Sequence, residues 1–176
     1  MKKLFLSLLI ATFVAMSASA KSLVIYFSWG GTTEKMANII VKSTGSDIWE
    51  IEPTQSYPKT YQKCGEIVKE ELENNIIRKV NGKAPDFSKY DTIYVGVPVW
   101  WHTAPTLVTN FLEEHKSELT GKTVIPFCTY AATYRDETLA KLVEVTPTAE
   151  HKEGYGTTNP KQNDVDDWLK KIGEIK

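Results

Sequence analysis

A glycine- and hydroxyl-rich segment, residues 28–33, has the residue types of a phosphate-binding loop. Its sequence is Ser-Trp-Gly-Gly-Thr-Thr, and it lies between an apolar run, 23–27, and a stretch typical of a helix, 34–41. The first N–H groups of a helix have no acceptor within the helix, and the positive end of the helix dipole lies beside them. Glycines let a phosphate approach the backbone, and hydroxyls add donors. We therefore expect this segment to hold the phosphate of a mononucleotide. The expected binding residues are Ser28, Trp29, Gly30, Gly31, Thr32 and Thr33.

Two further segments carry aromatic side chains directly after apolar runs. The sequence Val-Trp-Trp-His at 99–102 follows the run 92–97 and a proline, and Tyr130 and Tyr134 follow the run 123–128. Large aromatic rings beside an anion site can stack on a flat heteroaromatic ring, which adds about 0.5–1.5 kcal/mol per pair beyond burial. A flavin ring on a ribityl phosphate would suit the three loops together. Alternatively, one of the two tryptophans covers the core and the two tyrosines are surface residues.

The elements that must position these loops alternate between strand and helix. Strands are predicted at 23–27, 47–51, 92–97 and 123–128, with a weak edge strand within 147–158; helices are predicted at 33–43 and 60–74 and near 105–112, 136–143 and 163–172. The runs around Val24, Val95 and Val124 are apolar on both faces, as a parallel sheet covered on both sides requires. We therefore predict an α/β fold, a three-layer, doubly wound, five-stranded parallel sheet. Its right-handed crossovers place the three loops on one rim, where such sheets bind ligands.

Three local signals predict where helices begin. Pro105 suits the first position of a helix, where its missing N–H costs nothing. Asp136 and Asn163 are the residue types that cap helix N-termini, so each is expected to precede the first helical residue.

The first twenty residues have the layout of a secretory signal. Two lysines follow the initial methionine, an apolar stretch of leader length comes next, and Ala18-Ser19-Ala20 has the small-x-small form of a cleavage site. We expect residues 1–20 to be a signal peptide and residues 21–176 to be one domain. The protein is then exported, with the periplasm the expected compartment, and its mature part contains no apolar stretch able to span a membrane.

The charge balance gives no support to nucleic-acid binding. The whole chain carries a net charge of −1, and two of its positive charges belong to the predicted leader, so the mature part carries −3. A nucleic-acid-binding domain usually has a basic patch or stripe, and no basic run occurs in this sequence.

Cysteine and histidine are too few and too scattered to predict a metal site. The histidines are His102, His115 and His151, and no two have the spacing of metal ligands. Cys64 lies on the apolar face of a predicted helix and Cys128 ends an apolar strand. Two separate buried thiols are expected, although export would also permit a disulfide.

Other motifs are interpreted as structural. The carboxylate pairs Glu70-Glu71 and Asp166-Asp167 are expected to face solvent on helices. Gly154 and Gly156 lack the third glycine of a dinucleotide-binding fingerprint and do not follow a strong strand.

These residues together resemble the flavodoxin family. The segment 23–33, LVIYFSWGGTT, is similar to the first strand and phosphate loop of flavodoxins, whose motif is roughly [ST]-x-[ST]-G-x-T. Further matches are EIEP at 50–53 with Tyr57-Pro58 and Tyr61, YVGVPVWW at 94–101, and GKTVIPFCT at 121–129. The likeness covers nearly all of residues 21–176. It implies a flavodoxin-like fold with strand order 2-1-3-4-5 and FMN as the ligand.

The resemblance also implies roles for individual residues. Ser28, Gly31, Thr32 and Thr33 would hold the phosphate. Two loops would line the flavin ring, with Pro98, Val99, Trp100, Trp101 and His102 on one side and Thr129, Tyr130 and Ala131 on the other. Two positions depart from the family pattern. Gly30 stands where a hydroxyl is usual, and the third loop, 130–137, lacks the glycines of similar proteins.

The expected function is that of an exported FMN protein that carries electrons between redox partner proteins. An NAD(P)H-dependent quinone or flavin reductase of the same fold is an alternative, and so is a protein that kept the fold and lost the flavin. The compact mature chain and the lack of a second nucleotide motif favour a carrier over a substrate-converting enzyme.

Overall fold

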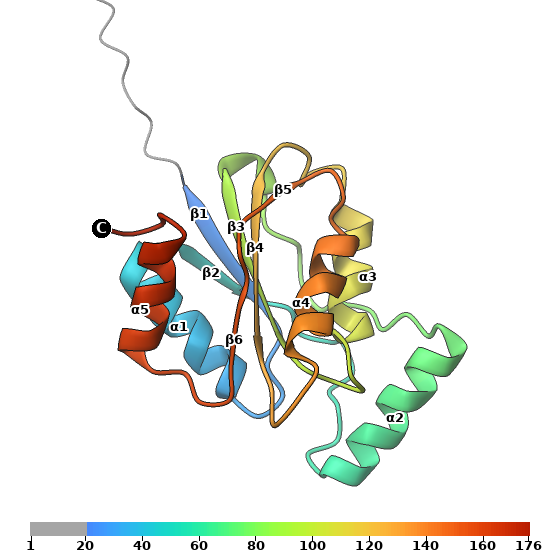
Figure 1. The fold of residues 1–176 in the computed structure, drawn as a ribbon. Helices are drawn as coiled ribbons and strands as arrows, with labels where there is room; N and C mark the ends of the chain where they lie inside the picture. Colours follow the sequence, from blue (N-terminus) through green and yellow to red (C-terminus); the bar gives the residue numbers. More distant parts are fainter. Residues whose placement is uncertain (1–20) are drawn as a thin grey trace, which may run out of the picture.

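The centre of the fold is a parallel β-sheet (Figure 1), and the computed structural model describes residues 21–176. The strands are β1 (Ser22–Tyr26), β2 (Asp47–Glu50), β3 (Thr92–Pro98), β4 (Thr123–Thr129), β5 (Glu150–His151) and β6 (Tyr155–Thr157). They lie in the order β2-β1-β3-β4-β5, and β6 also pairs with β4. The predicted fold class and strand order are thereby confirmed, with the last strand divided into two short pieces. The predicted signal peptide, 1–20, lies outside the described residues.

Helices cover both faces of the sheet and make it the middle of three layers (Figure 1). They are α1 (Thr32–Thr44), α2 (Tyr61–Asn74), α3 (Thr106–His115), α4 (Arg135–Glu144) and α5 (Gln162–Lys171), with a short 3-10 turn at Phe87–Lys89. Helices α1 and α5 pack on one face, and α3 and α4 pack on the other. Helix α2 projects from the body of the fold beside the ends of the strands (Figure 1). Each helix within residues 21–176 is too short or too polar to cross a membrane.

The strands are apolar on both faces because each face has its own core. In β1, Val24 and Tyr26 belong to the core under α1 and α5, whereas Leu23 and Ile25 belong to the core on the opposite side. Every one of these four side chains is at most 5% exposed. Alternate residues of a strand point to opposite faces, so a sheet buried on both sides needs a continuous apolar run.

Three helix starts differ from the predictions by one or two residues. Helix α3 begins after Pro105, which is the residue before the helix and not its first residue. Helix α4 begins at Arg135, so Asp136 lies within its first turn and is not the cap. Helix α5 begins at Gln162, so Asn163 is likewise inside the helix. No side chain caps these three N-termini. Asp136 still acts favourably there, because its negative charge lies beside the positive end of the helix dipole.

The prediction that Glu71 faces solvent is wrong. Its residue is 2% exposed, and its carboxylate accepts hydrogen bonds from the Tyr57 hydroxyl (2.8 Å) and from Arg78 Nε (2.7 Å). The guanidinium of Arg78 also lies 4.2 Å from the centre of the Tyr57 ring. This buried cluster fastens the projecting helix α2 to the segment that precedes it. Asp166 is half-buried and accepts a hydrogen bond from Ser43, whereas Glu70 and Asp167 are exposed as predicted.

Both cysteines are free and buried, in agreement with the favoured interpretation. Burial raises the pKa of the Cys64 thiol and raises that of Cys128 to about 12. Within residues 21–176 no group of three metal-ligating side chains comes together.

Candidate functional site

The first predicted loop leaves the N-terminus of α1 open. Gly31 precedes the helix with φ 83°, a left-handed conformation that suits glycine, and no side chain caps the helix there. Its N–H donates to Ser28 Oγ at 3.1 Å. A Cβ added at Gly30 would have no atom within 4 Å, so space beside the loop is free. The first N–H groups of α1 are therefore not capped by a side chain, as an anion site requires, although the Glu34 carboxylate lies close to Gly31, 3.9 Å from where its Cβ would be.

Thr33 differs from its neighbours because its side chain points into the protein. It is 1% exposed, and its hydroxyl lies 2.8 Å from the hydroxyl of Thr129, itself 5% exposed. A ligand at the surface of this loop could therefore accept a hydrogen bond from the backbone N–H of Thr33 but not from its hydroxyl. The pair instead joins the first loop to the end of β4, so that two of the predicted loops are held together.

The second predicted loop is a tight turn with unusual backbone angles. The backbone groups of Trp100 and Thr103 exchange two hydrogen bonds, of 2.9 and 3.0 Å. Between them, Trp101 and His102 have φ values of 44° and 69°. Left-handed angles are uncommon for bulky residues and cost on the order of 1–3 kcal/mol each, and such strain clusters at functional sites.

The two tryptophans of this turn have different roles. Trp100 packs against the rings of Phe27 and Tyr57, with centroids 5.1 and 4.8 Å away, and so covers the core. Trp101 is 46% exposed, and its indole N–H donates to the Gly65 carbonyl of α2 at 2.8 Å. For the tryptophans, the structure agrees with the alternative interpretation of the sequence, in which one tryptophan of the pair covers the core.

In the third predicted loop, the side chain of Tyr134 packs against the second loop. Tyr134 has φ 66°, and its ring lies 3.9 Å from the ring of His102, tilted by 30°. Ala131 lies beside it on the exposed loop. Tyr130 is half-buried, its N–H bonded to the Thr157 carbonyl at 3.3 Å, and it packs against the core.

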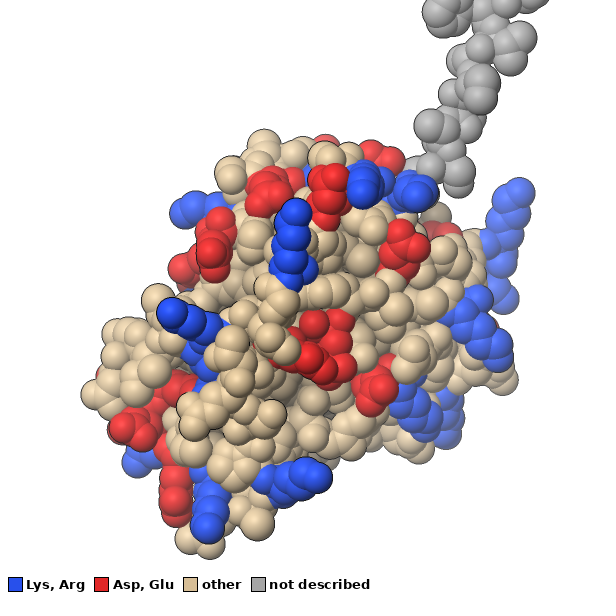
Figure 2. Space-filling model, turned by 180° about the vertical axis from the view of Figure 1, so that it is seen from behind, with Lys and Arg blue, Asp and Glu red and all other residues tan. Residues whose placement is uncertain are grey.

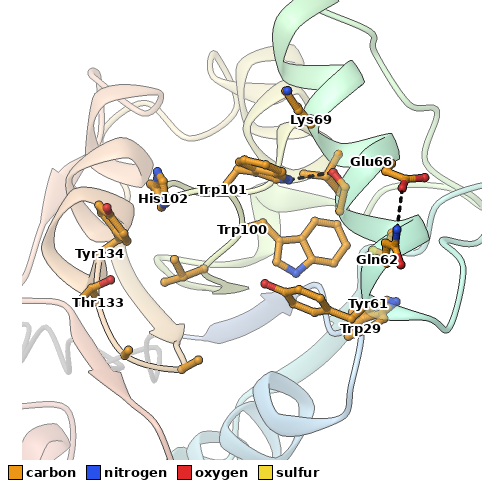
Figure 3. A pocket seen from close by; sticks show the side chains of 16 residues that line it. Trp29, Tyr61, Gln62, Glu66, Lys69, Trp100, Trp101, His102, Thr133 and Tyr134 are labelled. Atoms are coloured by element: carbon orange, nitrogen blue, oxygen red, sulfur yellow. Dashed lines mark hydrogen bonds between the residues drawn. The ribbon is translucent and has the colours of Figure 1, made fainter.

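A cavity of about 600 Å³ opens between these loops and α2 (Figure 3). Of the predicted site residues, it is lined by Trp29, Val99, Trp100, Trp101, His102 and Ala131. The other predicted residues lie outside its lining; they are Ser28, Gly30, Gly31, Thr32, Thr33, Pro98, Thr129 and Tyr130. The cavity volume falls within the range of about 300–1,000 Å³ that small-molecule sites occupy.

Sequence reasoning missed one wall of this cavity. Residues of α2, Tyr61 to Lys69, form the side opposite Tyr134 and His102 (Figure 3). Tyr134 itself was noted as a loop aromatic but was not among the predicted contacts. The available signal was the helical spacing of Tyr61, Cys64 and Val68, which marks the apolar face of α2 but not the loops that it faces.

The predicted phosphate-binding segment has no basic side chain of its own. The segment 28–33 contains no lysine or arginine, and Glu34 follows directly. Burial, together with the charges of Glu52 and Glu34, raises the pKa of Glu50, and burial with the charges of Glu50, Glu34 and Glu52 raises that of Tyr26. An anion there would be held by neutral donors and the helix dipole. On the face in Figure 2, acidic and basic side chains are interspersed.

Comparisons with known proteins agree with this architecture. The family model described as flavodoxin matches residues 21–172. A protein of Bacteroides eggerthii DSM 20697 assigned as a flavoprotein has a TM-score of 0.74 and 28% identity, covering 87% of this chain and 98% of its own. One from Bacteroides uniformis ATCC 8492 has a TM-score of 0.75 and 26% identity, covering 86% and 98%.

A third solved structure shares the fold at lower identity. It is a flavoprotein of Lactobacillus acidophilus NCFM in complex with FMN, with a TM-score of 0.71 and 24% identity, covering 85% of this chain and 99% of its own. No curated protein matches the sequence. Because the family model matches residues 21–172, and the sheet has the strand order of a flavodoxin-like fold, this protein belongs to the flavodoxin family.

Proposed function

We propose that this protein binds FMN and transfers electrons, and that it does so after export to the periplasm. The observation that carries the proposal is the position of two features on one rim of the sheet. The open N-terminus of α1 offers donors for a phosphate, and an aromatic cavity of about 600 Å³ begins at Trp29 beside it. A ligand with an anionic end and a flat ring matches both.

The residues present fit FMN. Ser28, Thr32 and the first N–H groups of α1 would hold the phosphate, and the free space at Gly30 leaves room for it. The loop 99–102 and the loop 131–134 would lie along the ring. The third loop lacks the glycines of similar proteins, yet the cavity remains open beside it, with Ala131, Ala132, Thr133 and Tyr134 in its lining.

Bound FMN would supply the redox chemistry, since flavins accept one or two electrons. The chain's own residues bind the cofactor, orient it and exclude water from part of its surface. Trp100 supports the loop from below through Phe27 and Tyr57, so the loop position is set by the core. A redox partner protein would exchange electrons through the exposed rim of the cavity.

The first experiment is a titration of the purified mature protein with FMN, followed by calorimetry and the visible spectrum. We expect one site and a shifted flavin spectrum that dithionite bleaches and a protein acceptor such as cytochrome c restores. A protein that shows no heat or spectral change would overturn FMN binding. Binding without reoxidation by any acceptor would overturn electron transfer.

Two variants at Gly30 test the phosphate position. Gly30→Glu adds a negative charge beside the open helix terminus, and Gly30→Gln adds nearly the same volume without charge. Because no atom lies near this Cβ position, both should fold normally. The glutamate variant should bind FMN about tenfold more weakly than the glutamine variant, which corresponds to roughly 1.4 kcal/mol. Equal affinities would place the phosphate elsewhere.

Export is tested on the full chain. Expressed in a bacterium, the protein should appear in the osmotic-shock fraction with the mass of residues 21–176. An intact chain that remains with cytoplasmic proteins would contradict the proposal.

A further inference from the structure

Thr129 is the residue at which the three predicted loops meet. Its hydroxyl lies 2.8 Å from the hydroxyl of Thr33 in the first loop. Its carbonyl accepts a hydrogen bond of 2.8 Å from the N–H of Val99 in the second loop. Thr129 is also the last residue of β4, so the third loop begins directly after it. A displacement of Thr129 would therefore be transmitted to both loops that line the cavity.

Thr33 connects this residue to the phosphate end of the proposed site. It is the second residue of α1, and the first bond of the helix runs from the Lys35 N–H to the Gly31 carbonyl, at 2.9 Å. The N–H of Thr33 is therefore among those without an acceptor in the helix. Thr33 thus presents its backbone to an anion at the surface and its hydroxyl to the end of β4.

The bond between the two hydroxyls is buried and lies outside the cavity. Among residues 21–176, each hydroxyl has only the other as a hydrogen-bond partner in the chain. A buried hydroxyl that loses its partner is strongly disfavoured, so loss of either one would disturb the other. Neither residue lines the cavity. An effect of the pair on a ring bound there must therefore pass through the loops.

Resting on the proposed FMN binding, we infer that Thr33 and Thr129 are a positioning pair whose bond holds the loops 99–102 and 131–134 where a flavin ring binds. The family resemblance gives each residue a direct contact, Thr33 with the phosphate and Thr129 with the ring. In the structure each hydroxyl is instead the partner of the other. Loops that are already in place need less ordering when a ligand binds, so the pair raises the affinity for a ring that it does not touch.

The test compares two flavins on the purified mature protein freed of bound cofactor. Riboflavin has the ring of FMN without its phosphate, so it reports on the ring end of the site. Thr33→Val keeps the shape of the side chain and removes the hydroxyl, and Thr32→Val makes the same change at the exposed neighbouring threonine. Calorimetry measures the Kd of each flavin. Urea unfolding measures stability, which a purely structural bond would change without changing either affinity.

We expect Thr33→Val to weaken riboflavin and FMN binding by the same factor, about tenfold. Thr33→Ser keeps the hydroxyl and should bind both flavins as the wild type does. Thr32→Val should weaken FMN binding alone, because it removes a donor to the phosphate and leaves the pair intact.

Thr129→Val should have the same effect as Thr33→Val, because both remove the same bond. The double variant Thr33→Val/Thr129→Val leaves neither hydroxyl buried without a partner, so it should fold even if the single variants are less stable. Its riboflavin affinity should equal that of either single variant, since one bond can be lost only once.

Unchanged riboflavin affinity in Thr33→Val, whatever happens to its stability, would overturn the inference, and so would additive losses in the double variant. Weaker binding of FMN alone would assign the Thr33 hydroxyl to the phosphate. A wild type that binds FMN but not riboflavin also defeats this inference alone, whereas failure to bind either flavin defeats the proposed function with it.

Discussion

The rings of His102 and Tyr134 face each other with centroids 3.9 Å apart, although they belong to loops that follow different strands. Both residues have left-handed backbone angles, as does Trp101 next to His102. Among the non-glycine residues in the described chain with positive φ, these three line the cavity and the fourth, Asn75, ends α2. Conformational strain is therefore concentrated where the proposed ligand lies, and the ring contact is one of the interactions that offset it.

Replacing Tyr134 separates strain from stacking. Tyr134→Ala removes the ring contact and keeps the unfavourable φ, whereas Tyr134→Gly removes both. We expect the glycine variant to be about 1 kcal/mol more stable than the alanine variant, because glycine adopts φ 66° without steric cost. Urea unfolding of both proteins measures the difference. If alanine proves the more stable, the left-handed conformation at this position is not present.

Removing the charge of Glu34 should strengthen FMN binding. This carboxylate lies in the first turn of α1, where it favours the helix but opposes a phosphate. Glu34→Gln should lower the Kd about threefold and lower the stability of the protein without FMN by about 0.5 kcal/mol. Glu70→Gln, on the exposed face of α2, is the control and should change neither. Calorimetry and urea unfolding measure the two effects, and weaker FMN binding by Glu34→Gln would contradict the phosphate position.

The buried pair of Arg78 and Glu71 should matter more for stability than a surface ion pair. The Arg78 side chain is 13% exposed and the Glu71 side chain 3%, and Arg78 Nη2 lies 2.6 Å from Glu71 Oε1. Arg78→Met leaves the Glu71 carboxylate buried without its cation, which should cost on the order of 3 kcal/mol. Adding Glu71→Gln removes the uncompensated charge and should restore part of the loss. Chemical unfolding of the single and double variants decides, and a double variant no better than Arg78→Met would show that the charge is not the cause.

Stability should fall at alkaline pH. Burial raises the pKa of Cys128 from its ordinary value of 9.0 to about 12, and it also raises the pKa values of Tyr57 and Tyr94. Above pH 9 the unfolded chain therefore releases protons that the folded chain retains. The free energy of unfolding should decrease as pH rises from 9 toward 12, by up to about 1.4 kcal/mol per pH unit for each such proton.

The control for this pH dependence is Cys128→Ala. It should make the decline between pH 9 and 10 shallower, because the tyrosines contribute mainly at higher pH. Urea unfolding at pH 7, 9 and 10 gives the slopes. A wild-type slope of zero, or one that Cys128→Ala leaves unchanged, would show that the thiol is not shielded in the folded state.

The central sheet could be predicted because the apolar sequences of its strands indicate burial on both faces. The apolar runs around Val24, Val95 and Val124 are not compatible with a sheet that exposes one face to solvent. The strand order was implied by the resemblance to the flavodoxin family. The divided last strand was not predictable, because its residues are polar and its position depends on packing. A Cβ at Gly154 would lie 2.8 Å from the Pro126 carbonyl, and one at Gly156 would lie 2.8 Å from Cys128 Sγ. These glycines allow close approach to β4, which no local motif expresses.

The loops of the candidate site were predictable for a related reason. They follow strands whose carboxyl ends must meet on one rim, so their proximity to one another follows from the topology alone. The orientation of individual side chains does not follow from the topology. Trp100 and Trp101 are adjacent in sequence, yet one covers the core and the other lies on α2. The burial of Glu71 likewise depends on Arg78 and Tyr57, which reach it only in the folded chain.

The edge strands of the sheet affect whether copies of this protein associate at high concentration. Strand β2, at one edge, has four residues and begins and ends with the acidic Asp47 and Glu50. At the other edge, β5 and β6 are separated by residues 152–154. Long, flat and uncharged edge strands are the ones that pair with further chains and aggregate. Within residues 21–176 the edge strands are short, charged or interrupted. Association of copies through added strands is therefore disfavoured.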